Sequence, residues 1–318
     1  MNLDQQLAAP GACLMVIAPH PDDESLAAGG LIQRALRHGA RVHIVFVTDG
    51  DNNPWPQRVL ELRWRIGTRE RARWAARRRE EAQGALHELG ADAVPVHRLQ
   101  WPDGGVTAKL VHETKTAIAQ WHALLDEIRP TLLVLPDLAD SHPDHSALHV
   151  LLELTLYAML PERPLQCLCY LLHGRARLDD ARRIALELTP QEAACKRAAI
   201  LAHRSQIALS RGRLLHFATA EERFASGVGN HSLRQPQLPW RPPRTLLPAM
   251  GLFAVDADGG QRLRCGARAE GAQVLRWRDD TPAAATQRPL QPPYYVKLFC
   301  TLPSPWVFDH WGWKRFTA

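Results

Sequence analysis

The sequence has few cysteines and no long apolar run, and both shortages exclude whole classes of protein. Its 318 residues include only six cysteines, spread along the chain. This spacing excludes a small disulfide-built scaffold and predicts reduced, mostly buried thiols in a cytoplasmic protein. No apolar stretch approaches the roughly 20 residues that a membrane-spanning helix needs. Residues 1–11 show no basic region followed by an apolar core, so no signal peptide is expected.

Internal repeats and low-complexity tracts are also missing, which excludes solenoid and disordered architectures. Hydrophobic residues make up 46% of the chain and charged residues 23%, a composition typical of an ordinary globular protein. The length fits one large domain, or a domain with a sizeable appendage. The formal charge of +6, much of it from arginine, is compatible with a phosphate-bearing partner but identifies none.

The first half of the chain alternates strand-like and helix-like segments. The strand-like apolar runs are residues 13–18, 42–47, 94–99 and 131–135, with one more at 165–172. The helix-like segments between and after them are residues 25–38, 60–89, 107–128, 146–159 and 190–209. Strands separated by helices of this length predict an α/β fold, Rossmann-like, with a mostly parallel sheet and helices on both faces. In such sheets ligands bind beyond the carboxyl ends of the strands.

The last third is less regular. Residues 234–248 are rich in proline, which marks a linker or an irregular wrap. Short strand-like runs follow it, so we expect a first domain over residues 1–233 and a small β-rich C-terminal region over 234–318. Aromatic residues near the end, such as Trp311 and Trp313, either stack on a sugar or form the core of this region.

Histidine and aspartate gather where two of the predicted strands end. The sequence Ala18-Pro19-His20-Pro21-Asp22-Asp23-Glu24 follows the first strand, and His142-Pro143-Asp144-His145 follows the strand at 131–135. These side chains are costly inside a sheet, so clusters of them at strand ends indicate a site. Mixed nitrogen and oxygen ligands suit a divalent metal such as zinc.

These motifs, together with Gly29-Gly30 and Val47-Thr48-Asp49-Gly50, resemble the PIG-L/LmbE family of zinc-dependent deacetylases. The resemblance covers about residues 12–210, and Ala27 departs from it by standing where the family often has glycine. It implies removal of the acetyl group from N-acetylglucosamine units carried by lipids, thiol glycosides, antibiotics or glycans.

The resemblance also implies a role for individual residues. The metal ligands would be His20, Asp23 and His145, holding Zn²⁺ or another divalent ion such as Fe²⁺. Asp22 would be the general base, and His142 would stabilise the oxyanion. Two nitrogens and one carboxylate leave open positions at a zinc ion for water and a substrate carbonyl, which is what such chemistry requires.

Three further positions carry alternatives. Asp144 either orients and charges the neighbouring oxyanion histidine or caps the helix that begins near Ser146. Arg78 and Asp103 match positions that bind the sugar, but one lies among many arginines of a solvated helix and the other in an ordinary turn. We interpret Glu24 as a first-turn helix acid.

We therefore expect a metal-dependent hydrolase that removes the N-acetyl group from an N-acetylglucosamine-type sugar in a glycoconjugate. The alternatives are an amidase for a larger N-acyl or thiol-conjugate substrate, and a noncatalytic carbohydrate- or nucleic-acid-binding protein. The basic, tryptophan-bearing stretch 55–79 would line the cleft mouth and meet a phosphate or an acidic sugar. A nucleic-acid partner would explain this stretch but not the histidine–aspartate clusters, so none is expected.

Overall fold

The computed structural model describes residues 2–159, 165–174, 178, 180–227, 232–233, 237–240, 242–266, 271–302, 308 and 310–317. The chain divides into two compact units. The first unit comprises Met1–Gly104, Ile128–Asp137 and Arg163–Gly227, and the second comprises Gly105–Glu127, Leu138–Glu162 and Val228–Ala318. The division expected from the sequence, into a domain over residues 1–233 and a region over 234–318, stays a prediction.

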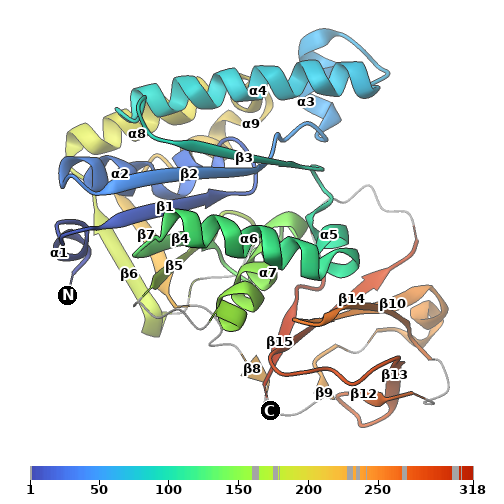
Figure 1. Ribbon diagram of the computed structural model, residues 1–318. Helices are drawn as coiled ribbons and strands as arrows, with labels where there is room; N and C mark the ends of the chain where they lie inside the picture. Colours follow the sequence, from blue (N-terminus) through green and yellow to red (C-terminus); the bar gives the residue numbers. More distant parts are fainter. Residues whose placement is uncertain are drawn as a thin grey trace. The chain divides into compact units, whose positions relative to one another are not determined.

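The first unit is built on a seven-stranded sheet with the order β3-β2-β1-β4-β5-β7-β6 (Figure 1). Its strands are β1 (Cys13–Ala18), β2 (Arg41–Thr48), β3 (Val96–Trp101), β4 (Leu132–Pro136), β5 (Gln166–Tyr170), β6 (Arg183–Glu187) and β7 (Glu221–Ser226). The first five in chain order pair in parallel, and β7 and β6 complete one edge in antiparallel fashion. Because β1 lies between β2 and β4, the strand order reverses at the carboxyl end of β1, where such sheets bind ligands.

The helices of this unit are α1 (Leu3–Leu7), α2 (Asp23–Arg37), α3 (Pro54–Glu61), α4 (Thr68–Glu88), α8 (Pro190–Ala202) and α9 (Arg204–Leu215), with a short 3₁₀ turn at Asp180–Arg182. The core joins apolar residues of β1 and β2 with those of α2, α4 and α8. Every residue of β1 is buried, as expected for a central parallel strand covered on both faces.

Helix α2 is interrupted at Ala28, whose φ of −136° is not helical. The amides of Gly30 and Leu31 donate instead to the carboxylate of Glu222 on β7, at 2.7 and 2.9 Å. Lys196 on α8 neutralises this buried carboxylate at 2.7 Å. A Cβ atom on Gly30 would lie 2.2 Å from Leu188, so the glycine is required by close packing.

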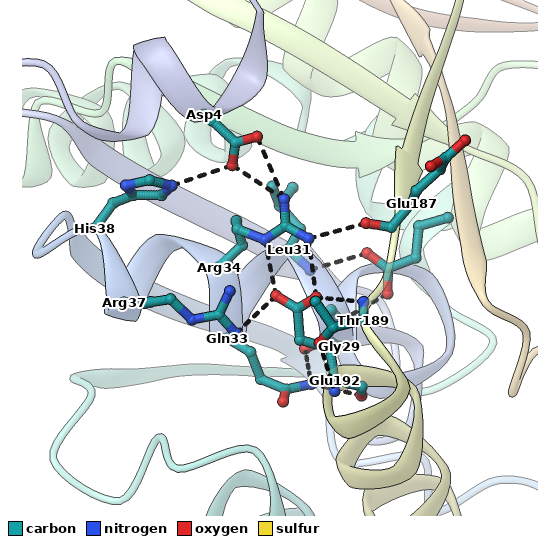
Figure 2. Close-up of polar contacts among 12 residues, drawn as sticks. Asp4, Gly29, Leu31, Gln33, Arg34, Arg37, His38, Glu187, Thr189 and Glu192 are labelled. Carbon is teal, nitrogen blue, oxygen red and sulfur yellow. Dashed lines mark hydrogen bonds and ion pairs between the residues drawn. The ribbon is translucent and has the colours of Figure 1, made fainter.

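Arg34 joins three elements of the first unit (Figure 2). Its guanidinium donates to Asp4 on α1 at 3.0 Å and to both carboxylate oxygens of Glu192 on α8 at 2.7 and 2.8 Å. It also donates to the backbone carbonyl of Glu187 at 2.9 Å. Glu192 forms a capping box with Thr189 at the start of α8, so one carboxylate serves the helix end and the ion pair together.

The second unit contains α5 (Val106–His112), α6 (Thr114–Ile128) and α7 (Pro143–Met159) and two sheets. The five-stranded sheet has the order β11-β10-β14-β15-β8, and the three-stranded sheet has the order β13-β12-β9. Their strands are β8 (Ser232–Leu233), β9 (Gln237–Leu238), β10 (Met250–Asp256), β11 (Gly259–Arg264), β12 (Gln273–Trp277), β13 (Pro282–Thr286), β14 (Tyr294–Cys300) and β15 (Lys314–Phe316), with a 3₁₀ turn at Arg244–Ala249. The predicted α/β class, mostly parallel sheet and β-rich C-terminal region are confirmed.

Three helical segments predicted as continuous are each two helices, and that part of the prediction is wrong. The 60–89 segment breaks after α3, where Leu62 has a left-handed φ of 51°, and α4 begins after the N-cap residue Gly67. The 107–128 segment breaks at Glu113. The 190–209 segment breaks at His203, whose side chain turns to a carboxylate on another helix, as the site shows below.

Among the described residues, no helix is both long enough and apolar enough to cross a membrane.

Candidate metal site and its surroundings

The end of β1 places His20 and Asp23 against each other. After Ala18 the chain turns through His20 and Pro21, and α2 begins at Asp23. The His20 Nδ1 atom lies 3.3 Å from Asp23 Oδ2, and both side chains are buried. Two ligands of one tetrahedral zinc ion, each about 2.1 Å from it, lie roughly 3.4 Å apart. The spacing and the donor types of this pair therefore fit a shared divalent metal.

The carboxylate of Asp22, next to this pair in the sequence, contacts Arg78. Its Oδ2 lies 3.1 Å from Arg78 Nη2, and its backbone has an unusual φ of 150°. The strain of such a conformation, in a region that favours glycine, must be held by surrounding contacts. One of them is the hydrogen bond from the Asp22 amide to Glu24 Oε2 at 3.0 Å. Burial raises the pKa of Asp22, and the positive charge of Arg78 opposes that rise.

Arg78 reaches this carboxylate from the middle of α4. It is buried, and it also donates to the backbone carbonyls of Pro21 and of Gly50, the latter at 3.1 Å. A Cβ atom on Gly50 would lie 1.8 Å from Arg78 Nη1. The glycine that ends the Thr48-Asp49-Gly50 motif is thus explained by the close approach of this arginine. Neighbouring Arg79 donates to Asp49 at 2.9 Å.

Asp103 lies on the other side of His20. Its Oδ1 is 3.2 Å from His20 Nε2, and its Oδ2 accepts a hydrogen bond from the Asn52 amide at 2.6 Å. Burial alone would raise the pKa of Asp103, but the hydrogen bond and charge of His20 outweigh it and hold that pKa below its usual value. A carboxylate so placed fixes the ring orientation of a metal-binding histidine. Contact of Asp103 with sugar stays a prediction.

In the second unit, the turn before α7 brings His142, Asp144 and His145 together. The two imidazole rings lie 5.1 Å apart between centroids. The Asp144 amide donates to His142 Nδ1 at 3.2 Å, so a neutral His142 ring carries its proton on Nε2. The Asp144 carboxylate accepts from the Val106 amide at 3.1 Å and thereby caps the start of α5.

Asp140 is a residue that sequence reasoning missed. Its Oδ2 lies 3.2 Å from His145 Nδ1, with both side chains fully buried, and its Oδ1 accepts from the His142 amide at 2.8 Å. A histidine that is held at Nδ1 by a carboxylate presents Nε2 to a metal. The signal available in the sequence was the aspartate two residues before His142.

Glu24 and His203 form a second arrangement that the sequence did not reveal. Glu24 is a first-turn acid of α2, as interpreted, but it is completely buried and contacts His203 Nε2 at 3.2 Å. Ser25 donates to the same carboxylate at 2.7 Å. Burial lowers the pKa of His203, but the hydrogen bond and charge of Glu24 outweigh that effect and raise it overall. The buried Glu24–His203 pair is thus connected to the strained Asp22 through the Asp22 amide, which donates to Glu24.

The C-terminal region contacts α7 within the second unit. Arg315 on β15 pairs with the buried Glu153 at 2.6 Å, and His149 lies 3.6 Å from the same carboxylate. The ring of Phe308 meets the His142 ring edge to face, with 6.0 Å between centroids. The C-terminal residues thus bear directly on the helix that carries the second histidine motif.

The predicted site residues are divided between the two units. His20, Asp22, Asp23, Arg78 and Asp103 come together in the first, and His142, Asp144 and His145 in the second. The histidines and aspartates among them are of the types that ligate divalent metal ions, whereas Arg78 is not. Fold and site chemistry together define a Rossmann-like α/β protein with histidine and aspartate at the sheet edge where this fold binds ligands.

Residues 15–155 match the PIG-L family, described as GlcNAc-PI de-N-acetylase. The matched segment makes up 141 of the 318 residues of the chain.

Two curated relatives are 1D-myo-inositol 2-acetamido-2-deoxy-alpha-D-glucopyranoside deacetylases. The protein from Mycobacteroides abscessus is 32% identical over 149 residues, 43% of this chain and 52% of its own length. The protein from Mycolicibacterium vanbaalenii is 26% identical over 242 residues, 63% of this chain and 82% of its own length. The chain thus spans about half the length of the first of these relatives.

Solved structures show the same fold. An N,N'-diacetylchitobiose deacetylase from Pyrococcus horikoshii superposes with a TM-score of 0.54 at 18% identity, covering 72% of this chain and 88% of that one. Teicoplanin deacetylase Orf2 superposes with a TM-score of 0.52 at 18% identity, covering 70% of this chain and 100% of that one.

Proposed function

We propose that the protein is a metal-dependent hydrolase that removes the N-acetyl group from an N-acetylglucosamine-type sugar in a glycoconjugate. The observation that carries this proposal is the end of β1. There, His20 and Asp23 have the spacing of two ligands of one metal ion, while the adjacent Asp22 carboxylate is paired with the buried Arg78. This arrangement lies inside the segment that matches the PIG-L family.

The proposed metal ligands are His20, Asp23 and His145. Strands β1 and β4 are paired neighbours, so their carboxyl ends lie at the same edge of the sheet. The chain leaves β4 at Pro136 and reaches the second histidine motif six residues later. When bound, zinc or another divalent ion such as Fe²⁺ would polarise the amide carbonyl and lower the pKa of water toward about 7.

Asp22 is the proposed general base. Its carboxylate would take the proton of the attacking water and later pass it to the leaving amine. Arg78 acts on this step as a positioning residue. It contacts the Asp22 carboxylate and donates to the backbone carbonyls of Pro21 and Gly50. A base that is tied to a buried arginine keeps one orientation through the reaction.

His142 is the proposed oxyanion donor. Its Nδ1 accepts from the Asp144 amide, so a neutral ring carries its proton on Nε2, and Nε2–H is the group that we assign as donor to the tetrahedral oxyanion. Asp140 fixes the position of both histidines of this motif, and we assign it the orienting role that the sequence gave to Asp144. The Asp144 carboxylate contributes by capping α5.

The substrate class follows from the relatives, whose names specify N-acetylated glucosamine units. A phosphate on the substrate would suit the positive charge of the chain, and the group attached to the sugar is left to experiment. A cytoplasmic location also stays a prediction.

The test is acetate release from a panel of water-soluble substrates, each with the protein as purified, after chelation, and after zinc or iron is restored. The panel contains the inositol glycoside of N-acetylglucosamine, N,N'-diacetylchitobiose and an N-acetylglucosamine phosphate. We expect acetate from at least one substrate, loss with chelator and recovery with metal. Cleavage of longer N-acyl analogues alone would favour the amidase alternative, and metal binding without release from any compound would contradict the proposal.

A further inference from the structure

One short segment of the first unit contains most of the exposed large apolar side chains among the described residues. Of the eight large apolar side chains that stand out as exposed there, five lie between positions 55 and 64. They are Trp55, Val59, Leu60, Leu62 and Trp64. Leu62 is 92% exposed and Trp64 is 75% exposed, values that a single folded domain ordinarily avoids for such residues.

The segment is held in place by buried residues on the inner side of α3, so the backbone that carries its exposed apolar side chains is fixed. On the inner side of α3, Pro56 and Gln57 are buried, and the Gln57 side chain donates to the Glu70 carbonyl at 2.7 Å. Leu62 ends α3 in a left-handed conformation, which turns the chain at the point of greatest exposure. In Figure 1 α3 and the turn after it lie at one end of α4.

The exposed rings are organised around one arginine. The Arg58 guanidinium lies 4.8 Å from the centre of the Trp55 ring and 5.3 Å from that of Trp64. The two rings meet edge to face at 6.4 Å. Arg58 also donates to the Trp64 carbonyl at 3.0 Å. The two tryptophans therefore stand in fixed positions at the surface.

Positive charge surrounds this apolar surface. Residues 55–71 contain five arginines against two glutamates. Arg65 and Arg69 are exposed, and neither forms an ion pair within the described part of the chain. A surface that inserts into the headgroup region of an anionic bilayer typically combines exposed tryptophan and leucine with arginines that form no ion pair within the protein. A nucleic acid would use the arginines but would leave Leu62 in water.

We propose that the Trp55–Arg65 segment binds an anionic membrane surface, with Leu62 and Trp64 entering the interfacial layer and the arginines contacting lipid phosphates. The segment is close in sequence to the site, since the Asn52 amide holds Asp103 beside His20. Membrane attachment through α3 and its turn would thus be transmitted to the wall of the site by only a few residues.

The experiment is flotation of the full chain with vesicles of phosphatidylcholine alone or of phosphatidylcholine with phosphatidylglycerol, at low and physiological salt. We expect binding to the anionic vesicles that weakens as salt rises. The double variant Leu62→Ser/Trp64→Ser should lose this binding with an unchanged melting temperature, because both side chains are exposed. Arg63→Gln and Arg65→Gln should each weaken it about fivefold.

Leu209→Ser is the matched control, since Leu209 is 49% exposed but lies on α9, outside the segment. It should bind like the parent chain. Failure of the parent to float with anionic vesicles at low salt would overturn the proposal, as would equal loss of binding in Leu209→Ser. A dimer in sedimentation that the double variant disperses, without vesicle binding, would assign the segment to a second copy instead. None of these readouts uses catalysis, so they stand apart from the proposed deacetylase activity.

Discussion

Replacing Glu192 with glutamine should remove a large share of the stability of the first unit. This carboxylate is fully buried and is held by two nitrogens of Arg34, by Arg37 at 2.9 Å and by the Thr189 amide at 2.7 Å. The hydrogen bond from Arg34 is the largest influence, and it lowers the pKa of Glu192 from 4.5 to about 2 against the effect of burial. Glutamine keeps the shape of the side chain but not its charge.

The lowered pKa translates into free energy of unfolding. A shift from 4.5 to about 2 corresponds to about 3 kcal/mol, because one pKa unit is worth about 1.4 kcal/mol. The folded state binds this proton more weakly than the unfolded chain does. The contribution is therefore complete above about pH 5 and is lost as the pH falls toward about 2.

The assay is urea unfolding of the parent chain and Glu192→Gln, followed by circular dichroism, at pH 7 and at pH 3. We expect a difference of about 3 kcal/mol at pH 7 and roughly half of that or less at pH 3. Glu187→Gln is the matched control, because its side chain is exposed and only its backbone carbonyl receives Arg34. Equal effects of the two variants, or a Glu192→Gln effect that is the same at both pH values, would refute the reasoning.

Four further predictions concern the site and the C-terminal region. His20→Ala should bind no stoichiometric metal in elemental analysis, and full occupancy would refute its role as a ligand. Asp22→Asn should keep its metal and fold while turnover falls on the order of 10²- to 10⁴-fold; near-normal turnover would remove it as the base. His142→Ala should lower kcat about 10²- to 10³-fold with little change in KM, whereas a change confined to KM would make it a binding residue. A chain that ends at Pro248 lacks Arg315, the ion-pair partner of a buried carboxylate on α7, so it should be mostly insoluble; normal yield and melting would contradict this.

The sequence predicted those parts of the fold that depend on neighbours along the chain. The apolar run at Cys13–Ala18 is β1 residue for residue, because a buried central strand needs little besides continuous hydrophobicity. The break at His203 was not foreseeable, since it depends on Glu24, 179 positions earlier. Strand β6 was also missed, because the run Arg183–Glu187 is half polar and lies at the edge of the sheet.

For the site, too, local features could be predicted from the sequence and long-range contacts could not. The proposed ligands and base stand in two short motifs, and motifs are visible in a sequence. The residues that hold these side chains in place are scattered along the sequence. Arg78, which the sequence alone indicates as a candidate for sugar binding, contacts Asp22 from 56 positions away. Asp140 was overlooked because one aspartate in a loop carries no pattern, and only its 3.2 Å contact with His145 reveals its use.

The division of the chain into interleaved segments has a practical consequence. The chain passes from one compact unit to the other five times, at residues 104/105, 127/128, 137/138, 162/163 and 227/228. No single cut can therefore release either unit as a continuous polypeptide. A protease nick at 104/105 divides the first unit and a nick at 227/228 divides the second, while a nick at any of the three points between them divides both. Gene fragments divided at those three inner points would have to reassemble as complementing pieces. Any continuous chain that contains one whole unit also carries part of the other.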